Sequence, residues 1–265
     1  FPGWDSVEKE RRELKSEVIF VVSNSKGEIV RRLNAPAKQG FHRIAWDLRY
    51  PSPSIINKSG RQNSMLGFMA PPGKYSVKMF LSKNGQVSQM SKEQFFDVVP
   101  LREGALPTKS HDEIAVFWRL YENTIKIASS IQTEINNLMS TIEKTKLALD
   151  QSRSSSGDIE SKYSLLRNKI LDLDERVSGN RSKSGPGEKN NPTVSSRLYV
   201  VGRIMEYSTY GPTETAKEQL ELSQKELTAI EDIIDNLDND LNVLLTAIYD
   251  SGGPLIEGKT GLITK

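Results

Sequence analysis

Hydrophobic and polar residues alternate strictly in the stretch GFHRIAWDLRYP at residues 40–51. Ile44, Trp46 and Leu48 fall on one side of the alternation, and mostly charged side chains fall on the other. Because successive side chains of a strand point to opposite faces of a sheet, this pattern predicts a half-buried strand. We therefore expect the three apolar side chains on a buried face of an antiparallel sheet.

Other short alternating runs precede Ser110, namely EVIFVV, EIVRRL, KYSVKMFL and EQFFDVVP. The segments at 24–27 and 83–85 carry Asn and Gly, which is typical of hairpin turns. Strands spaced this closely, with no helical period between them, predict a small immunoglobulin-like β-sandwich over residues 14–102. The irregular segment 52–73 is expected to be a surface loop, and loops often carry binding residues.

After Ser110 the hydrophobic period becomes helical. Ser110 and Glu113 have the spacing of a capping box, which predicts a helix start. Apolar residues then recur every three or four positions, which predicts helices with one buried stripe each. The stripes are Phe117, Leu120, Ile127, Ile131, Ile135, Leu138 and Ile142; Ile159, Tyr163, Leu166, Ile170, Leu173 and Val177; Val194, Leu198, Val201 and Met205; and Leu227, Ile230, Ile234, Leu237, Leu241, Leu244 and Ile248.

The connections between these helices are polar. We expect a short turn at 152–157, a flexible linker at 178–192, a cap at Thr213 or Thr215, and a helix end at 252–254. Because four stripes in one chain can bury one another, we favour an antiparallel helical bundle over residues 110–250 and a monomer. The alternative is that the stripes form coiled-coil contacts between chains. The predicted fold class is thus α+β with two domains.

Composition narrows the function classes. Among 265 residues, 36 Lys and Arg balance 34 Asp and Glu, so we expect no nucleic-acid partner. Cysteine is absent, which excludes disulfides, thiolate metal sites and a cysteine nucleophile. No apolar run reaches the roughly 20 residues that span a bilayer. The chain begins with FPGW, which we interpret as the start of a piece of a longer protein; Phe1, Pro2 and Trp4 are expected to pack against an upstream domain.

Few residues suggest catalysis. His42 and His111 would need to converge with a carboxylate to bind a metal, and we favour structural roles for both. Asp47 and Arg49 form either a recognition patch or, as we favour, an ion pair that pins the strand or a following loop. The carboxylates on the helices are expected to be solvated rather than paired across a glycosidase cleft.

The serines show no nucleophile-elbow pattern. Arg181, Lys183 and Lys189 in the linker could contact an anionic partner, but Glu188 and the scarcity of aromatic residues argue against it. We therefore predict no catalytic, metal or cofactor site, and the binding residues stay unknown at this stage.

Several of these residues carry a family resemblance. The first part of the chain resembles an immunoglobulin-like module of the flagellar hook-cap type. The matching residues are Gly27, Glu28, Val30, Arg31, Leu33, Gly40, Trp46, Asp47, Pro72, Gly73, Tyr75 and Val77. Together with the helices and the Gly-Pro-Thr turn at 211–213, residues 15–250 resemble the C-terminal part of sortilin-like, BNR-repeat β-propeller proteins of Bacteroidetes type. Such proteins are often labelled glycosyl hydrolases from the propeller alone.

The resemblance implies an exported protein that is periplasmic, outer-membrane-associated or extracellular. It implies a non-catalytic accessory region that braces an upstream propeller or contacts an envelope protein or a glycan. The chain has no Asp-box repeat, so no activity of the propeller carries over to its residues. Two alternatives stay open: part of a glycoside-hydrolase cleft completed by the propeller, and an oligomerising scaffold or adhesin that associates through the helical stripes.

Overall fold

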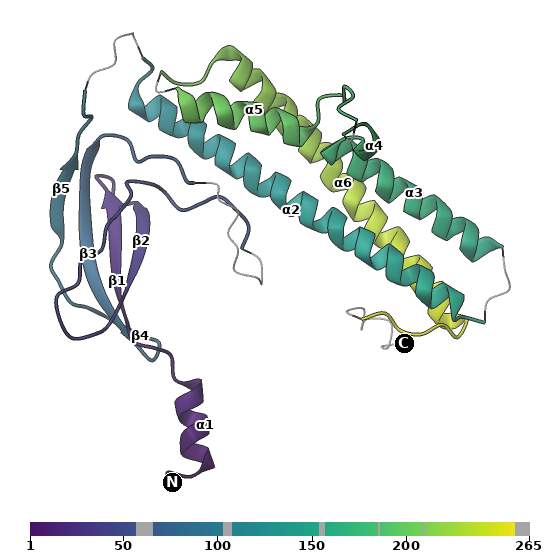
Figure 1. Cartoon of the computed structure of the whole chain (residues 1–265), viewed down its shortest axis with the longest axis horizontal. Coiled ribbons are helices and arrows are strands. Elements are labelled where there is room, and N and C mark those ends of the chain that lie inside the picture. Colours follow the sequence, from purple (N-terminus) through teal and green to yellow (C-terminus); the bar gives the residue numbers. More distant parts are fainter. Residues whose placement is uncertain (57–65, 103–107, 154–156, 185, 209, 258–265) are drawn as a thin grey trace. The chain divides into compact units, whose positions relative to one another are not determined.

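The computed structural model describes residues 1–56, 66–102, 108–153, 157–184, 186–208 and 210–257. The protein is α+β, with an antiparallel sheet followed by long helices (Figure 1). Its elements are α1 (Trp4–Arg12), β1 (Glu17–Asn24), β2 (Ile29–Pro36), β3 (Gly73–Lys83), β4 (Gln86–Gln89), β5 (Gln94–Val98), α2 (His111–Asp150), α3 (Asp158–Ser178), α4 (Arg181–Ser184), α5 (Val194–Tyr207) and α6 (Glu214–Asp250).

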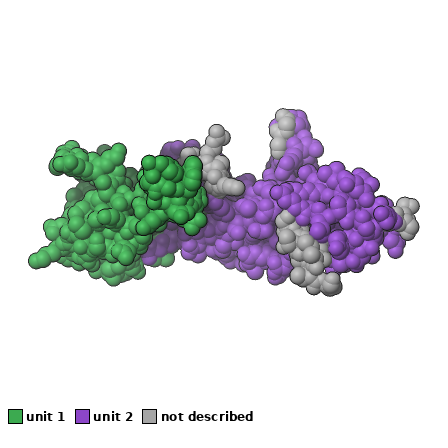
Figure 2. All heavy atoms as spheres, turned by 90° about the horizontal axis from the view of Figure 1, so that it is seen from below, with its two compact units in different colours: residues 1–53, 63–118 green, residues 54–62, 119–265 purple. Residues whose placement is uncertain are grey.

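The chain divides into two compact units, which Figure 2 colours separately. The sheet unit comprises residues 1–53 and 63–118, and the helical unit comprises residues 54–62 and 119–265. Each unit is described by itself below. The domain limits of 14–102 and 110–250 stay a prediction.

The described strands form one five-stranded antiparallel sheet in the order β2-β1-β3-β4, with β5 also paired to β3. Both predicted hairpins are confirmed. In the first turn, Asn24 Oδ1 accepts hydrogen bonds of 3.0 Å from the backbone nitrogens of Lys26 and Glu28. In the second, Asn84 and Gly85 have φ angles of 48° and 83°, as a two-residue type I′ turn requires. The immunoglobulin-like sandwich itself stays a prediction.

The core of the sheet unit gathers around aromatic rings. Val22, Val30, Ala70 and Tyr75 are buried together, and partly buried Trp46 and Phe96 pack against them. The Trp46 ring lies 5.6 Å from that of Tyr75 and 6.2 Å from that of Phe96, both edge-on. The Trp46 side chain thus contributes to the hydrophobic core, as the apolar face of its stretch predicted.

The predicted strand at 41–49 is wrong. Residues 41–47 carry no strand pairing, Phe41 is 89% exposed, and Leu48 has a positive φ of 58°. Only Trp46 reaches the core cluster, and its Nε1–H donates to the Arg49 carbonyl at 3.0 Å. The alternation reflects an extended chain that has no neighbouring strand among the described residues. After the turn at Leu48, residues 48–50 form a short antiparallel backbone pairing with residues 68–70.

The predicted helical stripes are largely confirmed. The Ser110 capping box is present, with the Glu113 nitrogen donating to Ser110 Oγ at 3.2 Å and the Ser110 nitrogen donating to Glu113 Oε2 at 3.0 Å. Most stripe residues are buried: Phe117, Ile131, Ile135, Leu138, Ile142, Leu166, Ile170, Leu173, Val177, Val194, Leu198, Val201, Met205, Leu227, Ile230, Leu237, Leu241, Leu244 and Ile248.

Two residues of the first stripe are corrected. Leu120 and Ile127 are 45% and 43% exposed, whereas Tyr121 and Thr124 are buried. The buried positions from Phe117 to Ile142 are spaced mainly by three, four or seven residues, and some of them are polar. Thr124 fits because its hydroxyl donates to the Leu120 carbonyl at 2.8 Å and accepts from Gln224 Nε2 at 3.0 Å. An apolar-only pattern misses such positions.

Side-chain contacts join the helices of the helical unit. The Tyr121 hydroxyl of α2 donates to the Leu198 carbonyl of α5 at 3.2 Å, and Ser178 Oγ of α3 donates to Gln132 Oε1 of α2 at 3.0 Å. α6 packs along both α3 and α5. These contacts support the proposed bundle, which stays a prediction as an antiparallel arrangement.

The connections differ in part from expectation. Thr213 caps α6, since its Oγ1 accepts from the Ala216 nitrogen at 3.2 Å. Within the linker, α4 is a short helix and Asn180 Oδ1 accepts from the Lys183 nitrogen at 3.2 Å, so the linker is not entirely coil. The rest of these predictions falls partly outside the described residues, at 57–65 of the loop, 154–156 of the turn and 185 of the linker.

Candidate functional site

The helix α1 has a surface that the fold does not bury. It has nine residues and buries none of them. Gly3, with φ 86°, precedes it, and the Val7 nitrogen donates to the Gly3 carbonyl at 3.2 Å. Asp5 lies in the first turn and basic residues lie in the last, which matches the helix dipole.

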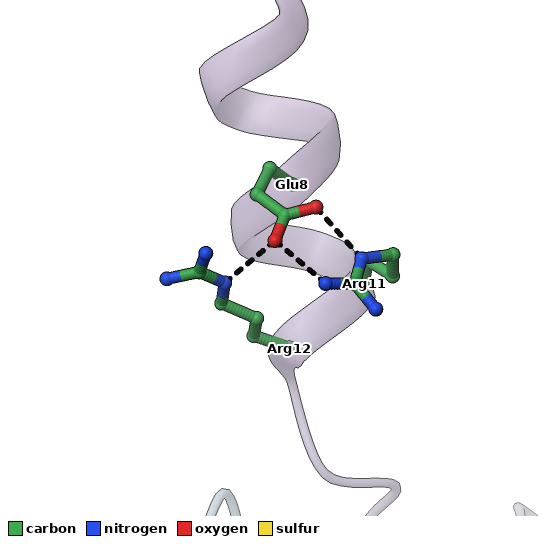
Figure 3. Close-up of polar contacts among 3 residues, drawn as sticks. All are labelled: Glu8, Arg11 and Arg12. Carbon is green, nitrogen blue, oxygen red and sulfur yellow. Dashed lines mark hydrogen bonds and ion pairs between the residues drawn. The ribbon is translucent and has the colours of Figure 1, made fainter. Parts of the chain in front are cut away.

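An ion cluster closes the last turn of α1 (Figure 3). The Glu8 carboxylate accepts from Arg11 Nε and Nη2 and from Arg12 Nε, each at 2.7 Å. Arg11 first, and then Arg12, lowers the pKa of Glu8, while Glu8 raises the pKa of Arg11. The three side chains therefore hold the helix turn. The spacings of three and four in EKERR are the signal for this cluster, a signal of charge spacing that the hydrophobic pattern does not contain.

The start of α1 and the residues before it expose apolar side chains. Phe1, Trp4 and Val7 are 85%, 78% and 37% exposed, and the Phe1 and Trp4 rings lie 4.9 Å apart in an edge-on arrangement. These three side chains are named the α1 apolar surface. A helix this short is marginal in water by itself, and exposed apolar patches mark interaction sites. The α1 apolar surface is therefore the candidate functional site.

The side chains of Asp47 and Arg49 form hydrogen bonds with backbone groups. Asp47 Oδ1 accepts from the Arg49 nitrogen at 3.0 Å, and Arg49 Nη1 donates to the Gly67 carbonyl at 2.9 Å. A Cβ at Gly67 would overlap the carbonyl oxygens of Tyr50 and Pro51. The pair thus secures the approach of segments 48–51 and 67–70, through backbone hydrogen bonds.

The two histidines do not line a buried face. His42 is exposed, with Nε2 2.9 Å from the Lys38 carbonyl oxygen, and His111 is the exposed first residue of α2. No group of three or more His, Asp or Glu side chains in the described ranges could hold a metal ion.

Four carboxyl groups have a pKa below the ordinary value. Hydrogen bonds lower the pKa of Glu8, Glu93, Glu160 and Glu221, with Ser76 the main cause at Glu93 and the Gly157 backbone at Glu160. A glycosidase general acid needs the opposite shift. Burial raises the pKa of Tyr121 to about 12, and its hydroxyl donates to a backbone carbonyl.

The basic linker residues are partly engaged. Arg181 Nη2 lies 2.7 Å from the Asp174 carboxylate, whose side chain is only 7% exposed. A polar hollow of about 370 Å³ lies beside it, lined by both acidic and basic side chains such as Glu175, Arg176 and Lys183. This mixture of charges indicates no single ligand class.

Comparison of the chain with protein-family models, with curated proteins and with solved structures gave no match. The resemblance to propeller-associated modules therefore stays an expectation. Among the helices of the described residues, none is long and apolar enough to cross a membrane.

Proposed function

We propose that the chain is a non-catalytic accessory region of an exported β-propeller protein, and that it braces the propeller through the α1 apolar surface. The resemblance suggests a periplasmic, outer-membrane-associated or extracellular location. The observation that carries the proposal is the exposure of Phe1, which precedes α1, and of Trp4, the first residue of a helix that buries none of its residues.

The energetics favour a docked α1. Burying one large apolar side chain is worth about 1.5 to 3 kcal/mol, whereas an exposed ion pair contributes about 0 to 1 kcal/mol. Phe1 and Trp4 would therefore supply most of the binding energy, as aromatic residues do at the centre of protein interfaces. The exposed cluster of Glu8, Arg11 and Arg12 would form the polar rim.

The propeller is the proposed partner because the resemblance implies a propeller upstream of this region. A domain of the same chain would meet α1 at a high effective concentration, so even a modest contact area would suffice. Bracing through α1 leaves the strands and the long helices to serve as the scaffold behind that contact.

The test is calorimetric titration of this chain with the propeller supplied as a separate chain. We expect the double variant Phe1→Ala/Trp4→Ala to bind at least about tenfold more weakly, equivalent to 1.4 kcal/mol. The matched control is Phe95→Ala on β5, which truncates a side chain that is 78% exposed elsewhere in the sheet unit. Unchanged affinity of the double variant, or an equal loss in the control, would contradict the proposal.

A further inference from the structure

Charge is strongly segregated along the chain although its net value is only +2. Residues 29–92 contain eleven Lys and Arg but a single acidic residue, Asp47. Residues 226–250, the C-terminal two thirds of α6, contain seven Asp and Glu and no Lys or Arg. The chain thus contains one basic stretch and one acidic stretch.

Several carboxylates of the acidic stretch of α6 are exposed, and they repel one another. Glu231, Asp232 and Asp235 are exposed, and their spacings of three and four place like charges side by side on α6. The repulsion among these carboxylates would be relieved by cations arriving from outside the helix.

The basic stretch includes a segment in which every residue is exposed. Residues 36–45 are ten consecutive exposed residues that belong to no strand pairing beyond Pro36. They include Lys38 and Arg43, neither of which forms an ion pair within the described residues. Phe41, at 89% exposure, lies between them and could add apolar contact. This stretch is named the 36–45 segment.

We propose that the 36–45 segment of one copy docks on the acidic residues 226–250 of α6 of a second copy. The sequence supplies both complementary charges, which favours a second copy over a foreign polyanion. Because the net charge is close to zero, repulsion between whole copies is small. The two surfaces differ, so the contact is head-to-tail and can continue beyond a dimer. These surfaces are not the helical stripes whose burial led to the expectation of a monomer, and they are independent of the α1 apolar surface.

Sedimentation velocity over a concentration series tests the proposal at about 20 mM and about 500 mM salt. We expect an average mass above 29.7 kDa that grows with concentration at low salt and returns to that value at high salt. The variants Lys38→Glu/Arg43→Glu and Glu231→Lys/Asp235→Lys should each associate at least about tenfold more weakly. The control Lys162→Glu/Arg167→Glu changes two exposed charges on α3 and should associate like the original chain.

Mixing the two charge-reversed variants gives the sharpest readout. The reversed 36–45 segment of one variant then matches the reversed α6 of the other, so association should return in the mixture. A single-chain mass at every concentration would overturn the proposal, as would association that salt does not weaken or a mixture no better than either variant alone. Association that requires added dextran sulfate would overturn it in favour of a polyanionic ligand.

Discussion

The sheet unit and the helical unit hold their cores together in different ways. The core of the sheet unit is concentrated, with the rings of Trp46, Tyr75 and Phe96 within 6.2 Å of one another beside Val22 and Val30. The core of the helical unit is spread along the helices, where aliphatic side chains are buried turn after turn. A concentrated core should be sensitive to the loss of one ring, and a distributed core should lose stability in small steps.

Trp46→Ala should have the largest effect. It removes both edge-on ring contacts and the hydrogen bond to the Arg49 carbonyl, and we expect a loss of about 3 kcal/mol. Trp4 and Trp118 also belong to the sheet unit, so tryptophan fluorescence during urea unfolding reports on that unit. The helical signal in circular dichroism should hardly move, and a parallel loss in both signals would contradict the separation of the two cores.

Gly202→Ala should have the next largest effect, and it tests a close approach between two helices of the distributed core. A Cβ at position 202 would overlap the Tyr121 hydroxyl, so we expect a loss of about 2 kcal/mol. Tyr121→Phe removes the hydroxyl and makes room. In a double-mutant cycle followed by circular dichroism, the double variant should therefore lose less than the sum of the single variants. Additive losses would show that the overlap is relieved elsewhere.

Conservative truncation in the helical stripes should have a smaller and uniform effect. Ile135, Ile170 and Ile230 are fully buried in three different helices, and each Ile→Val change should cost about 1 kcal/mol. The measurement is the urea midpoint from circular dichroism. Exposed Ile127→Val serves as the control and should cost almost nothing. One position that costs several times more than the others would argue against a distributed core.

The smallest effect should come from acid at α1. Arg11 and Arg12 lower the pKa of Glu8 below its ordinary value of 4.5. The cluster therefore supports α1 fully above that value, and the support is lost as the pH falls through the lowered pKa. We expect faster amide exchange in α1 at about pH 3 than at about pH 6 after correction for intrinsic rates. In Glu8→Gln, the corrected exchange should not change with pH, and an equal acid response there would rule out the cluster as its cause.

The helical region could be predicted well because the spacing of apolar residues along a helix shows which of its faces is buried. Residues three and four apart share a face whatever the rest of the chain does, so Val194, Leu198, Val201 and Met205 were identified without knowledge of their partners. The burial of Thr124 and Tyr121 could not be predicted, because their polar groups are satisfied by hydrogen bonds that only the fold reveals.

The sheet region was harder because alternation shows an extended chain but not its neighbour. The stretch around Trp46 alternates, yet its backbone pairs with another segment only after the turn at Leu48. That turn could not be predicted, because a leucine rarely adopts a positive φ and nothing in the neighbouring sequence indicates one. The hairpins were predictable because Asn and Gly carry their turn conformation in the sequence. For the candidate site, Phe1 and Trp4 were identified by their hydrophobicity, whereas the Glu8 cluster needed attention to charge spacing.

Hydrogen exchange of α1 tests the central claim most directly. The amides of residues 4–12 would be followed in this chain alone and with the separate propeller domain. Because α1 buries no residue, we predict rapid exchange alone and strong protection in the complex, with protection lost in Phe1→Ala/Trp4→Ala. Binding of the propeller without added protection of α1 would place the contact elsewhere and contradict the account, and so would the absence of binding.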